Sequence, residues 1–271
     1  MSLNKKKIVI LGAGFAGIYA YLRLHKLFHK RSDVQITIVN RHNYFEFRPL
    51  IHEVASGGLS RENVVRPIRQ MVRCCPTNFL EAEIEAVNLA RQEVNTSGGK
   101  LPYDYLILAL GATDNFFNIP GATEHTQTLK SVTDSAGLRN HLLNTFEQAT
   151  HEVDKSRRDR LLRTVVIGGG PTGVEIAGEL ADLVNDELAL AYPTLRGQMC
   201  KIIILQSRGR VVPQARAEVS VSVLKKLEEL GVVVRFKTRA KEITKDGVIT
   251  DQGIKFSPRL LFGQLVSRRQ R

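Results

Sequence analysis

Two glycine-rich motifs of one pattern, GxGxxG, occur at residues 12–17 and 168–173. Each follows a run of β-branched apolar residues, and each opens a segment with helical periodicity. In a strand–turn–helix unit the first glycine permits a tight turn, the second lets a pyrophosphate approach the backbone, and the third lets helix and strand pack closely. One copy is weak support, but two copies in this context predict two dinucleotide-binding units. The residues expected to contact phosphate are Gly12, Gly14, Phe15, Ala16 and Gly17 in the first motif and Gly168, Gly170, Pro171, Thr172 and Gly173 in the second.

Apolar runs and turn residues along the chain predict an α/β fold built from two Rossmann-like dinucleotide-binding domains. We expect the first domain to occupy residues 1–115 and the second residues 116–255. The predicted strands are 7–11, 34–39, 79–87, 105–110, 163–167, 201–205 and 232–234, with a hairpin over 92–103, and the predicted helices are 15–29, 60–72, 133–153, 171–190 and 217–230.

Composition narrows the function classes. With 271 residues, 43% of them hydrophobic, the chain can bury one large core or two moderate ones. Its net charge of +12 suits polyanionic cofactors or an anionic membrane face, while no basic stripe interleaved with aromatic residues indicates nucleic-acid binding. The three cysteines, Cys74, Cys75 and Cys200, form neither a metal-binding pattern nor a CxxC pair. Unpatterned cysteines favour a reducing cytoplasm, with a Cys74–Cys75 disulfide as a minor alternative.

Whether the N-terminal segment is a signal peptide has to be considered separately. Three lysines at residues 5–7 precede fifteen uncharged residues, an arrangement that superficially resembles a signal peptide. The glycines of the first motif lie inside this run, however, and the run is shorter than the ~20 residues that span a bilayer. We therefore expect a cytoplasmic protein that is at most peripheral on the cytoplasmic membrane face.

Three further segments carry a family resemblance. They are NRHNYF at residues 40–45 leading to RPL at 48–50, YDYLILALGA at 103–112, and GVEIAGEL at 173–180. With both glycine motifs, they make residues 5–255 resemble the two-dinucleotide-binding flavoprotein reductases, and most of all the type II NADH dehydrogenases. The resemblance implies that the first fold holds FAD, the second holds NADH, and a quinone accepts the electrons at a membrane surface.

The resemblance also implies roles for single residues. It places Glu175 where nicotinamide and flavin meet, Gly111 near the flavin, the Ile84 backbone near the adenine, and Asn40 at the flavin-side ribose. Arg41, next in the motif, is also expected to bind the cofactor. Each has a plainer alternative. Glu175 also suits a first-turn helix acid favoured by the helix dipole. Gly111 also suits a strand-ending turn, and Ile84 suits strand core.

Two positions depart from the family pattern. Asn40 stands where the family usually has Asp or Glu, and its amide can still bind a ribose hydroxyl. Gln206 stands at the corresponding position of the second unit. A carboxylate there would repel a 2′-phosphate, whereas Gln removes the repulsion and Arg208 can pair with the phosphate. We therefore hypothesise that NADPH is accepted beside NADH.

The end of the chain is the largest departure. Members of the family return to the flavin fold with a strand, a Gly-Asp motif and a membrane-binding segment. Here that strand is expected near Phe256, yet no Gly-Asp motif follows Gly111. We therefore expect the C-terminal part of the fold to be missing, the FAD-binding domain to be incomplete, and residues 256–271 to be an aberrant stub.

Three functions stay open at this point. The first is an NAD(P)H dehydrogenase that passes hydride to FAD and electrons to quinone. The second is a related reductase with a soluble acceptor, and the third is an inactive or binding-only fragment. A disulfide reductase is disfavoured because no cysteine pair lies beside the first helix. No metal site is expected, and homodimerisation is left open.

Overall fold

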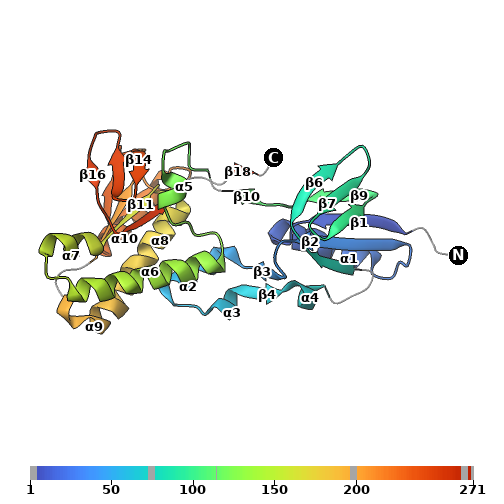
Figure 1. Ribbon diagram of the computed structural model, residues 1–271, viewed down its shortest axis with the longest axis horizontal. Helices are drawn as coiled ribbons and strands as arrows, with labels where there is room; N and C mark the ends of the chain where they lie inside the picture. Colours follow the sequence, from blue (N-terminus) through green and yellow to red (C-terminus); the bar gives the residue numbers. More distant parts are fainter. Residues whose placement is uncertain (1–4, 73–76, 114, 196–199, 264–267, 270–271) are drawn as a thin grey trace. The chain divides into compact units, whose positions relative to one another are not determined.

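The computed structural model describes residues 5–72, 77–113, 115–195, 200–263 and 268–269. The chain divides into two compact units (Figure 1), and each is considered by itself. The first consists of Met1–Phe47, Glu62–Thr113 and Arg269–Arg271. The second consists of Arg48–Arg61 and Asp114–Arg268.

The first unit is built on a four-stranded parallel sheet in the order β5-β2-β1-β9. A three-stranded antiparallel sheet, β6-β7-β8, and a small β3-β4 pair complete it. Its elements are β1 (Lys6–Leu11), α1 (Phe15–Phe28), β2 (Val34–Asn40), β3 (Tyr44–Glu46), α3 (Arg61–Val64), β4 (Val65–Pro67), α4 (Ile68–Met71), β5 (Thr77–Glu81), β6 (Ile84–Asn88), β7 (Glu93–Thr96), β8 (Gly99–Pro102), β9 (Tyr105–Leu108) and β10 (Ala112–Thr113).

The second unit repeats this plan with a parallel sheet in the order β13-β12-β11-β17 and an antiparallel sheet, β14-β15-β16. Its elements are a 3₁₀ turn (Arg48–Leu50), α2 (Ile51–Ser56), α5 (Ala122–His125), α6 (Val132–His151), α7 (Lys155–Leu161), β11 (Arg163–Ile167), α8 (Pro171–Asp182), a π-helical segment (Leu183–Leu188), α9 (Ala189–Ala191), a 3₁₀ turn (Pro193–Leu195), β12 (Lys201–Leu205), α10 (Ala217–Glu229), β13 (Val233–Arg235), β14 (Ala240–Thr244), β15 (Gly247–Thr250), β16 (Lys255–Phe256) and β17 (Leu260–Gly263). The division between the units falls within β18 (Arg268–Arg269).

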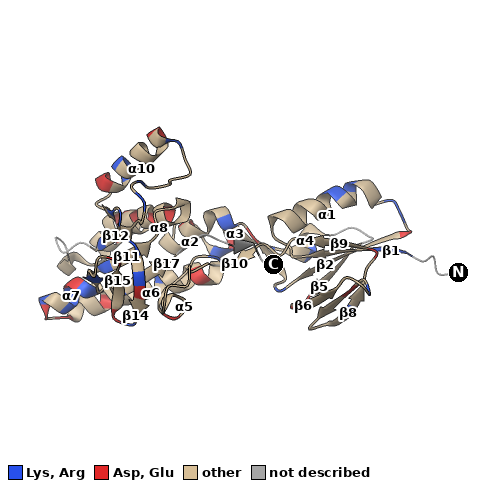
Figure 2. Ribbon diagram, turned by 90° about the horizontal axis from the view of Figure 1, so that it is seen from above, with Lys and Arg blue, Asp and Glu red and all other residues tan. Residues whose placement is uncertain are grey.

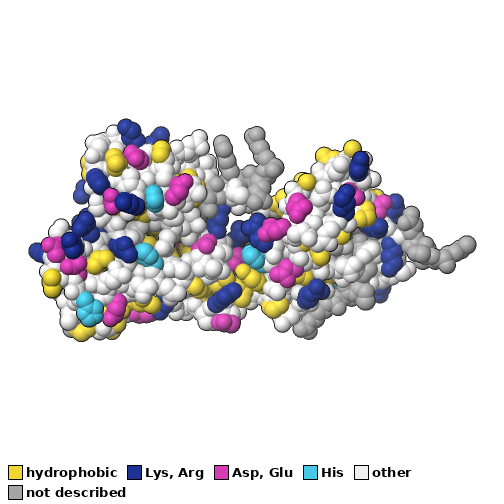
Figure 3. All heavy atoms as spheres, in the orientation of Figure 1, with side chains coloured by type: hydrophobic (Ala, Val, Ile, Leu, Met, Phe, Trp, Pro, Cys, Tyr) yellow, Lys and Arg dark blue, Asp and Glu magenta, His cyan; other side chains and the backbone are white. Residues whose placement is uncertain are grey.

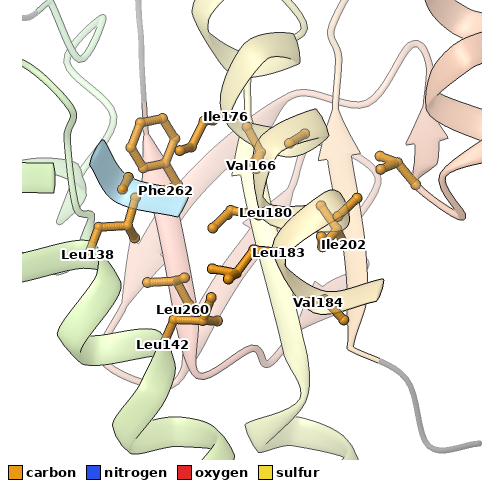
Figure 4. Close-up of a cluster of buried hydrophobic side chains, with 14 of the residues drawn as sticks. Leu138, Leu142, Val166, Ile176, Leu180, Leu183, Val184, Ile202, Leu260 and Phe262 are labelled. Carbon is orange, nitrogen blue, oxygen red and sulfur yellow. The ribbon is translucent and has the colours of Figure 1, made fainter. Parts of the chain in front are cut away.

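Successive side chains of the central strands face opposite sides of the parallel sheet, and each side is covered by a different layer of the second unit. In β11, Val166 faces the helices α6 and α8, whereas Val165 and Ile167 face the antiparallel sheet. Strand β17 does the same, with Leu260 and Phe262 on the helical side and Leu261 on the other. Because both faces are covered, these strands are nearly continuous apolar runs, as is usual in parallel sheets. Figure 4 shows the helical side of this core, where Phe262 and Leu260 lie beside side chains from α6 and α8.

The two-unit Rossmann-like fold expected from the sequence is thus confirmed, but the predicted limits are too simple. Arg48–Arg61, expected in the first domain, groups with the second unit. There Ser135 Oγ donates to the Ile51 carbonyl at 2.9 Å. Leu260–Gly263, expected in an aberrant stub, forms β17 and pairs with β11. In the second sheet, β17 takes the place that β9 has in the first.

Several predicted elements need correction. The helix expected over 60–72 is interrupted by β4, because Pro67 lacks the N–H that a helix interior requires. The strand expected over 79–87 is two strands, β5 and β6, in different sheets. Helix α6 begins one residue earlier than expected. Ser131 is its N-cap, in a capping box with Asp134. The helix expected over 171–190 changes to a π-helical segment after Asp182.

None of the helices in the described ranges combines the length and apolar character that crossing a bilayer requires.

Candidate functional site

The first glycine motif forms the turn between β1 and α1. Gly12 has φ +98°, a region that favours glycine. A Cβ on Gly17 would overlap the Gly12 carbonyl oxygen, so α1 contacts the turn closely. Gly14 is different, because a Cβ there would meet no atom of the described chain within 4 Å. The motif is therefore tight at its two outer glycines and open at its middle one.

The second motif repeats this geometry between β11 and α8. Gly168 has φ +103°, and a Cβ on Gly173 would overlap the Gly168 carbonyl oxygen. Gly170 again borders open space. Pro171 occupies the first helical position, where its missing N–H costs no intrahelical bond.

Both helices begin without neutralising side chains. Gly14 and Gly170 are the N-caps of α1 and α8, and neither helix has a side-chain cap or an acid in its first turn. The first N–H groups of a helix and the positive end of its dipole attract anions. Each loop, with its open middle glycine, therefore fits the pyrophosphate of a dinucleotide.

Asn40, at the end of β2, uses both ends of its amide to fix the first loop. Its Oδ1 accepts from the Ala13 N–H at 2.9 Å, and its Nδ2 donates to the His42 carbonyl at 2.8 Å. An aspartate could accept from Ala13 but could not donate to His42. The structure therefore explains an amide where a carboxylate was expected. One Nδ2 hydrogen remains for a ribose hydroxyl.

The other predicted residues of the first unit gather at the same end of its sheet. Arg41 pairs with Glu83 at 2.7 Å, and Ile84 follows directly at the start of β6. Phe15 makes edge contacts with Phe45 and Phe47, at centroid distances of 5.2 and 5.4 Å.

Two of these residues keep their plainer alternatives. Ile84 packs against the hydrophobic cluster on one face of the sheet, as strand core would. Gly111 has φ +78°, which suits the turn after β9.

In the second unit, Gln206 is buried rather than presented to a ligand. Its Nε2 donates to the Arg210 carbonyl at 2.8 Å. A Cβ on Gly169 would contact the Gln206 side chain at 3.3 Å, so Gln206 fills the space beneath the loop. What remains of the predicted role of Gln206 is that it places no negative charge at the end of β12.

Arg208 lies just beyond Gln206 and is exposed. Its carbonyl accepts from the Lys237 N–H at 3.3 Å, which brings a second exposed cation to the end of β12. Sequence reasoning missed Lys237, because 29 residues separate it from Arg208 and no motif marks it.

Glu175 is the fifth residue of α8 and is exposed. The first turn of α8 contains no acid, so the interpretation of Glu175 as a first-turn dipole acid is wrong. No hydrogen bond or ion pair engages its carboxylate within the described ranges. The carboxylate is thus free to contact a ligand one turn beyond the phosphate loop.

Thiol and metal chemistry find no support in the described residues. Cys200 is partly buried beside Thr164, and desolvation of its sulfur raises the pKa of the thiol to about 11, which leaves it protonated at neutral pH. Cys74 and Cys75, considered above as a disulfide pair, lie outside the described residues. In the described ranges no group of three or more His, Cys, Asp or Glu side chains could hold a metal ion.

Comparisons of the sequence and of the structure with known proteins indicate the same family. A model of the family described as pyridine nucleotide-disulphide oxidoreductase matches residues 6–262. An external alternative NAD(P)H-ubiquinone oxidoreductase, B2, from Arabidopsis thaliana mitochondria is 34% identical over 90% of this chain and 43% of the relative. The type II NADH:quinone oxidoreductase Ndh of Mycobacterium tuberculosis is 31% identical over 90% of this chain and 53% of the relative. The chain thus spans about half the length of these relatives.

A solved structure is also similar. NDH2 from Plasmodium falciparum, determined in complex with NADH, superposes with a TM-score of 0.89 and 27% sequence identity. The superposition covers 98% of this chain and 56% of the Plasmodium chain. These comparisons confirm the predicted resemblance to type II NADH dehydrogenases and the predicted two-dinucleotide-binding fold.

Proposed function

Because the chain belongs to the pyridine nucleotide-disulphide oxidoreductase family, we propose that it transfers hydride from NAD(P)H to FAD and passes the electrons to a quinone. The observation that carries the proposal is the pair of like units, each with an open glycine loop at an uncapped helix N-terminus. FAD would supply the redox chemistry, while the protein binds and orients the two cofactors. The relatives' quinone acceptors support the choice of acceptor.

We assign FAD to the first unit and NAD(P)H to the second. In the first, the Gly14 backbone receives the pyrophosphate and Asn40 holds the loop in shape. In the second, the Gly170 backbone receives the pyrophosphate, and the exposed Glu175 carboxylate orients the nicotinamide. Residue 115 remains the proposed limit between the FAD-binding and NAD(P)H-binding segments, with Arg48–Arg61 packed in the second unit.

A place on the cytoplasmic face of a membrane belongs to the same proposal. The net charge of +12 favours such a place, since basic proteins are attracted to anionic membrane surfaces. Self-association into a homodimer is a further part of the proposal that gel filtration can test.

Anaerobic reduction of the purified chain tests the function. We expect the protein to retain FAD, to be yellow, and to lose its flavin colour when NADH is added. Reoxidation by a soluble quinone would then favour quinone as the acceptor. Reoxidation only by ferricyanide or ferredoxin would favour a reductase with a soluble acceptor. A folded but colourless protein that does not take up added FAD would instead support the binding-only alternative.

NADPH is expected to reduce the enzyme with a kcat/KM within about tenfold of that for NADH, that is, within about 1.4 kcal/mol. The end of β12 carries the neutral Gln206 and the exposed cations Arg208 and Lys237, and none of these three side chains repels a 2′-phosphate. Replacing both cations, as in Arg208→Ala with Lys237→Ala, should lower kcat/KM for NADPH and leave that for NADH nearly unchanged.

The matched control is Lys225→Ala with Lys226→Ala, which removes two exposed charges from α10. It should affect neither nucleotide. A wild-type preference for NADH of about a thousandfold, or about 4 kcal/mol, would end the hypothesis.

A further inference from the structure

A cavity of about 950 Å³ lies in the second unit, away from its glycine loop. It is formed by the end of α6, by α7, by the β14–β15 turn and by the residues that lead into β17. β11 and β17 both begin beside it, whereas the glycine loop follows the other end of β11. Five residues of β11 at ~3.3 Å each separate the two places by roughly 16 Å. The cavity is therefore not part of the dinucleotide site.

Cations predominate in the lining. In Figure 3 blue side chains gather over the end of this unit that carries α7. Three acids are also present, Glu147, Glu152 and Asp246, together with His151. The basic lining residues are Arg157, Arg160, Lys245, Lys255 and Arg259.

The acids do not neutralise these cations. Glu147 lies 3.7 Å from His151 and also interacts with Tyr192, and Glu152 Oε1 accepts from the Asp154 N–H at 2.9 Å. Among the described residues, no carboxylate lies within 4.0 Å of the charged nitrogens of the five cations. Five cations without an ion-pair partner therefore line one cavity with three carboxylates, which leaves an excess of two positive charges that favours a bound anion.

A backbone hydrogen bond holds two of the basic residues at neighbouring positions. The Arg259 N–H donates to the Arg160 carbonyl at 3.1 Å, at the point where β17 and β11 begin. Both arginines line the cavity from these neighbouring backbone positions. Guanidinium is planar and binds the oxygens of phosphate or carboxylate in pairs, so this arrangement suits a doubly charged oxyanion group.

The kind of ligand follows from the lining. The described lining residues include no Phe, Tyr or Trp, and their one ring is the exposed imidazole of His151, so the lining offers charge rather than an aromatic surface. The volume is within the range of small-molecule sites, which is about 300–1,000 Å³. We propose that this cavity binds a phosphate-bearing polyanion at a site separate from both glycine loops. This proposal does not depend on the oxidoreductase function.

Isothermal titration of the 271-residue chain with inorganic pyrophosphate at low ionic strength tests the proposal. The cavity variant is Arg160→Ala with Arg259→Ala, and the control is Lys225→Ala with Lys226→Ala, which removes the same charge from α10. We expect the cavity variant to lose about tenfold or more of the affinity and the control to keep it. Pyrophosphate bound at the glycine loops would remain in both variants, so failure of the dinucleotide assignment would not imitate this result.

A second arm identifies the source of the phosphate. Binding to phosphatidylcholine vesicles that contain phosphatidylglycerol is compared with binding to phosphatidylcholine alone. If the cavity variant also loses the vesicle binding, the phosphate is that of a lipid headgroup; if vesicles do not bind, it is that of a free metabolite. Equal pyrophosphate affinities of the cavity variant and the control, or no binding by the wild type at millimolar concentration, would overturn the proposal. Unfolding curves should show both variants folded, because all four side chains are exposed.

Discussion

Gly173→Ala is expected to destabilise the second unit and to abolish NADH binding, whereas Gly170→Ala should weaken NADH binding without changing stability. A Cβ on Gly173 would overlap the carbonyl oxygen of Gly168, and backbone must shift to admit it. Such overpacking costs about 1–3 kcal/mol. Gly170 has φ −76° and open space beyond it, so alanine fits there in the free protein. The new methyl group would occupy the place proposed for the pyrophosphate.

The first unit offers the same comparison with FAD. Gly17→Ala should destabilise, because its Cβ would overlap the Gly12 carbonyl, and Gly14→Ala should only weaken FAD binding. Urea unfolding gives the stability, and titration with each dinucleotide gives the affinity. Equal destabilisation by the two substitutions of a pair, or an affinity unchanged in Gly14→Ala and Gly170→Ala, would contradict the assignment of the loops to pyrophosphates.

These glycines also show which parts of the fold can be predicted from sequence. The motif glycines directly follow the apolar strands β1 and β11 in the sequence, so their pattern specifies a strand, a turn and a helix. The same reasoning predicted β11, β12 and the start of α8 correctly. The same reasoning was less successful where contacts with residues distant in the sequence decide which sheet a strand joins. Residues 79–87 alternate as one strand would, yet β5 joins the parallel sheet and β6 the antiparallel one.

The site shows the same limit at the level of single side chains. Sequence position predicted that Asn40 and Gln206 lie at the strand ends, which is where they are found. Spacing could not predict their partners. Asn40 connects Ala13 to His42, and Gln206 binds the Arg210 carbonyl. These partners depend on how loops close, and for the same reason the proximity of Lys237 to Arg208 required the three-dimensional structure.

The residues after 255 provide the clearest case in which the fold overrules the interpretation from sequence. A resemblance to longer relatives led us to expect a stub from residue 256. Instead, Leu260–Gly263 pairs in parallel with β11 and completes the sheet in the same order as the first unit. The similarity of LLFG to YLIL of β9 is too short to be read from sequence, but the topological equivalence is evident. Strand β17 is therefore expected to contribute strongly to the stability of its unit.

Phe262→Ala tests this contribution and is expected to lower the free energy of unfolding of the second unit by about 3–5 kcal/mol, as other buried Phe-to-Ala substitutions do. The Phe262 ring is 0% exposed and packs in the cluster formed by α6, α8 and β11 (Figure 4). Its strand, β17, pairs with β11, and both are labelled in Figure 2. Leu190→Ala, in an exposed position of α9 in the same unit, is the control and should cost less than about 0.5 kcal/mol. Urea unfolding followed by circular dichroism measures both. If Phe262→Ala were as stable as the control, β17 would not be part of the folded sheet, and the equivalence of the two units would be lost.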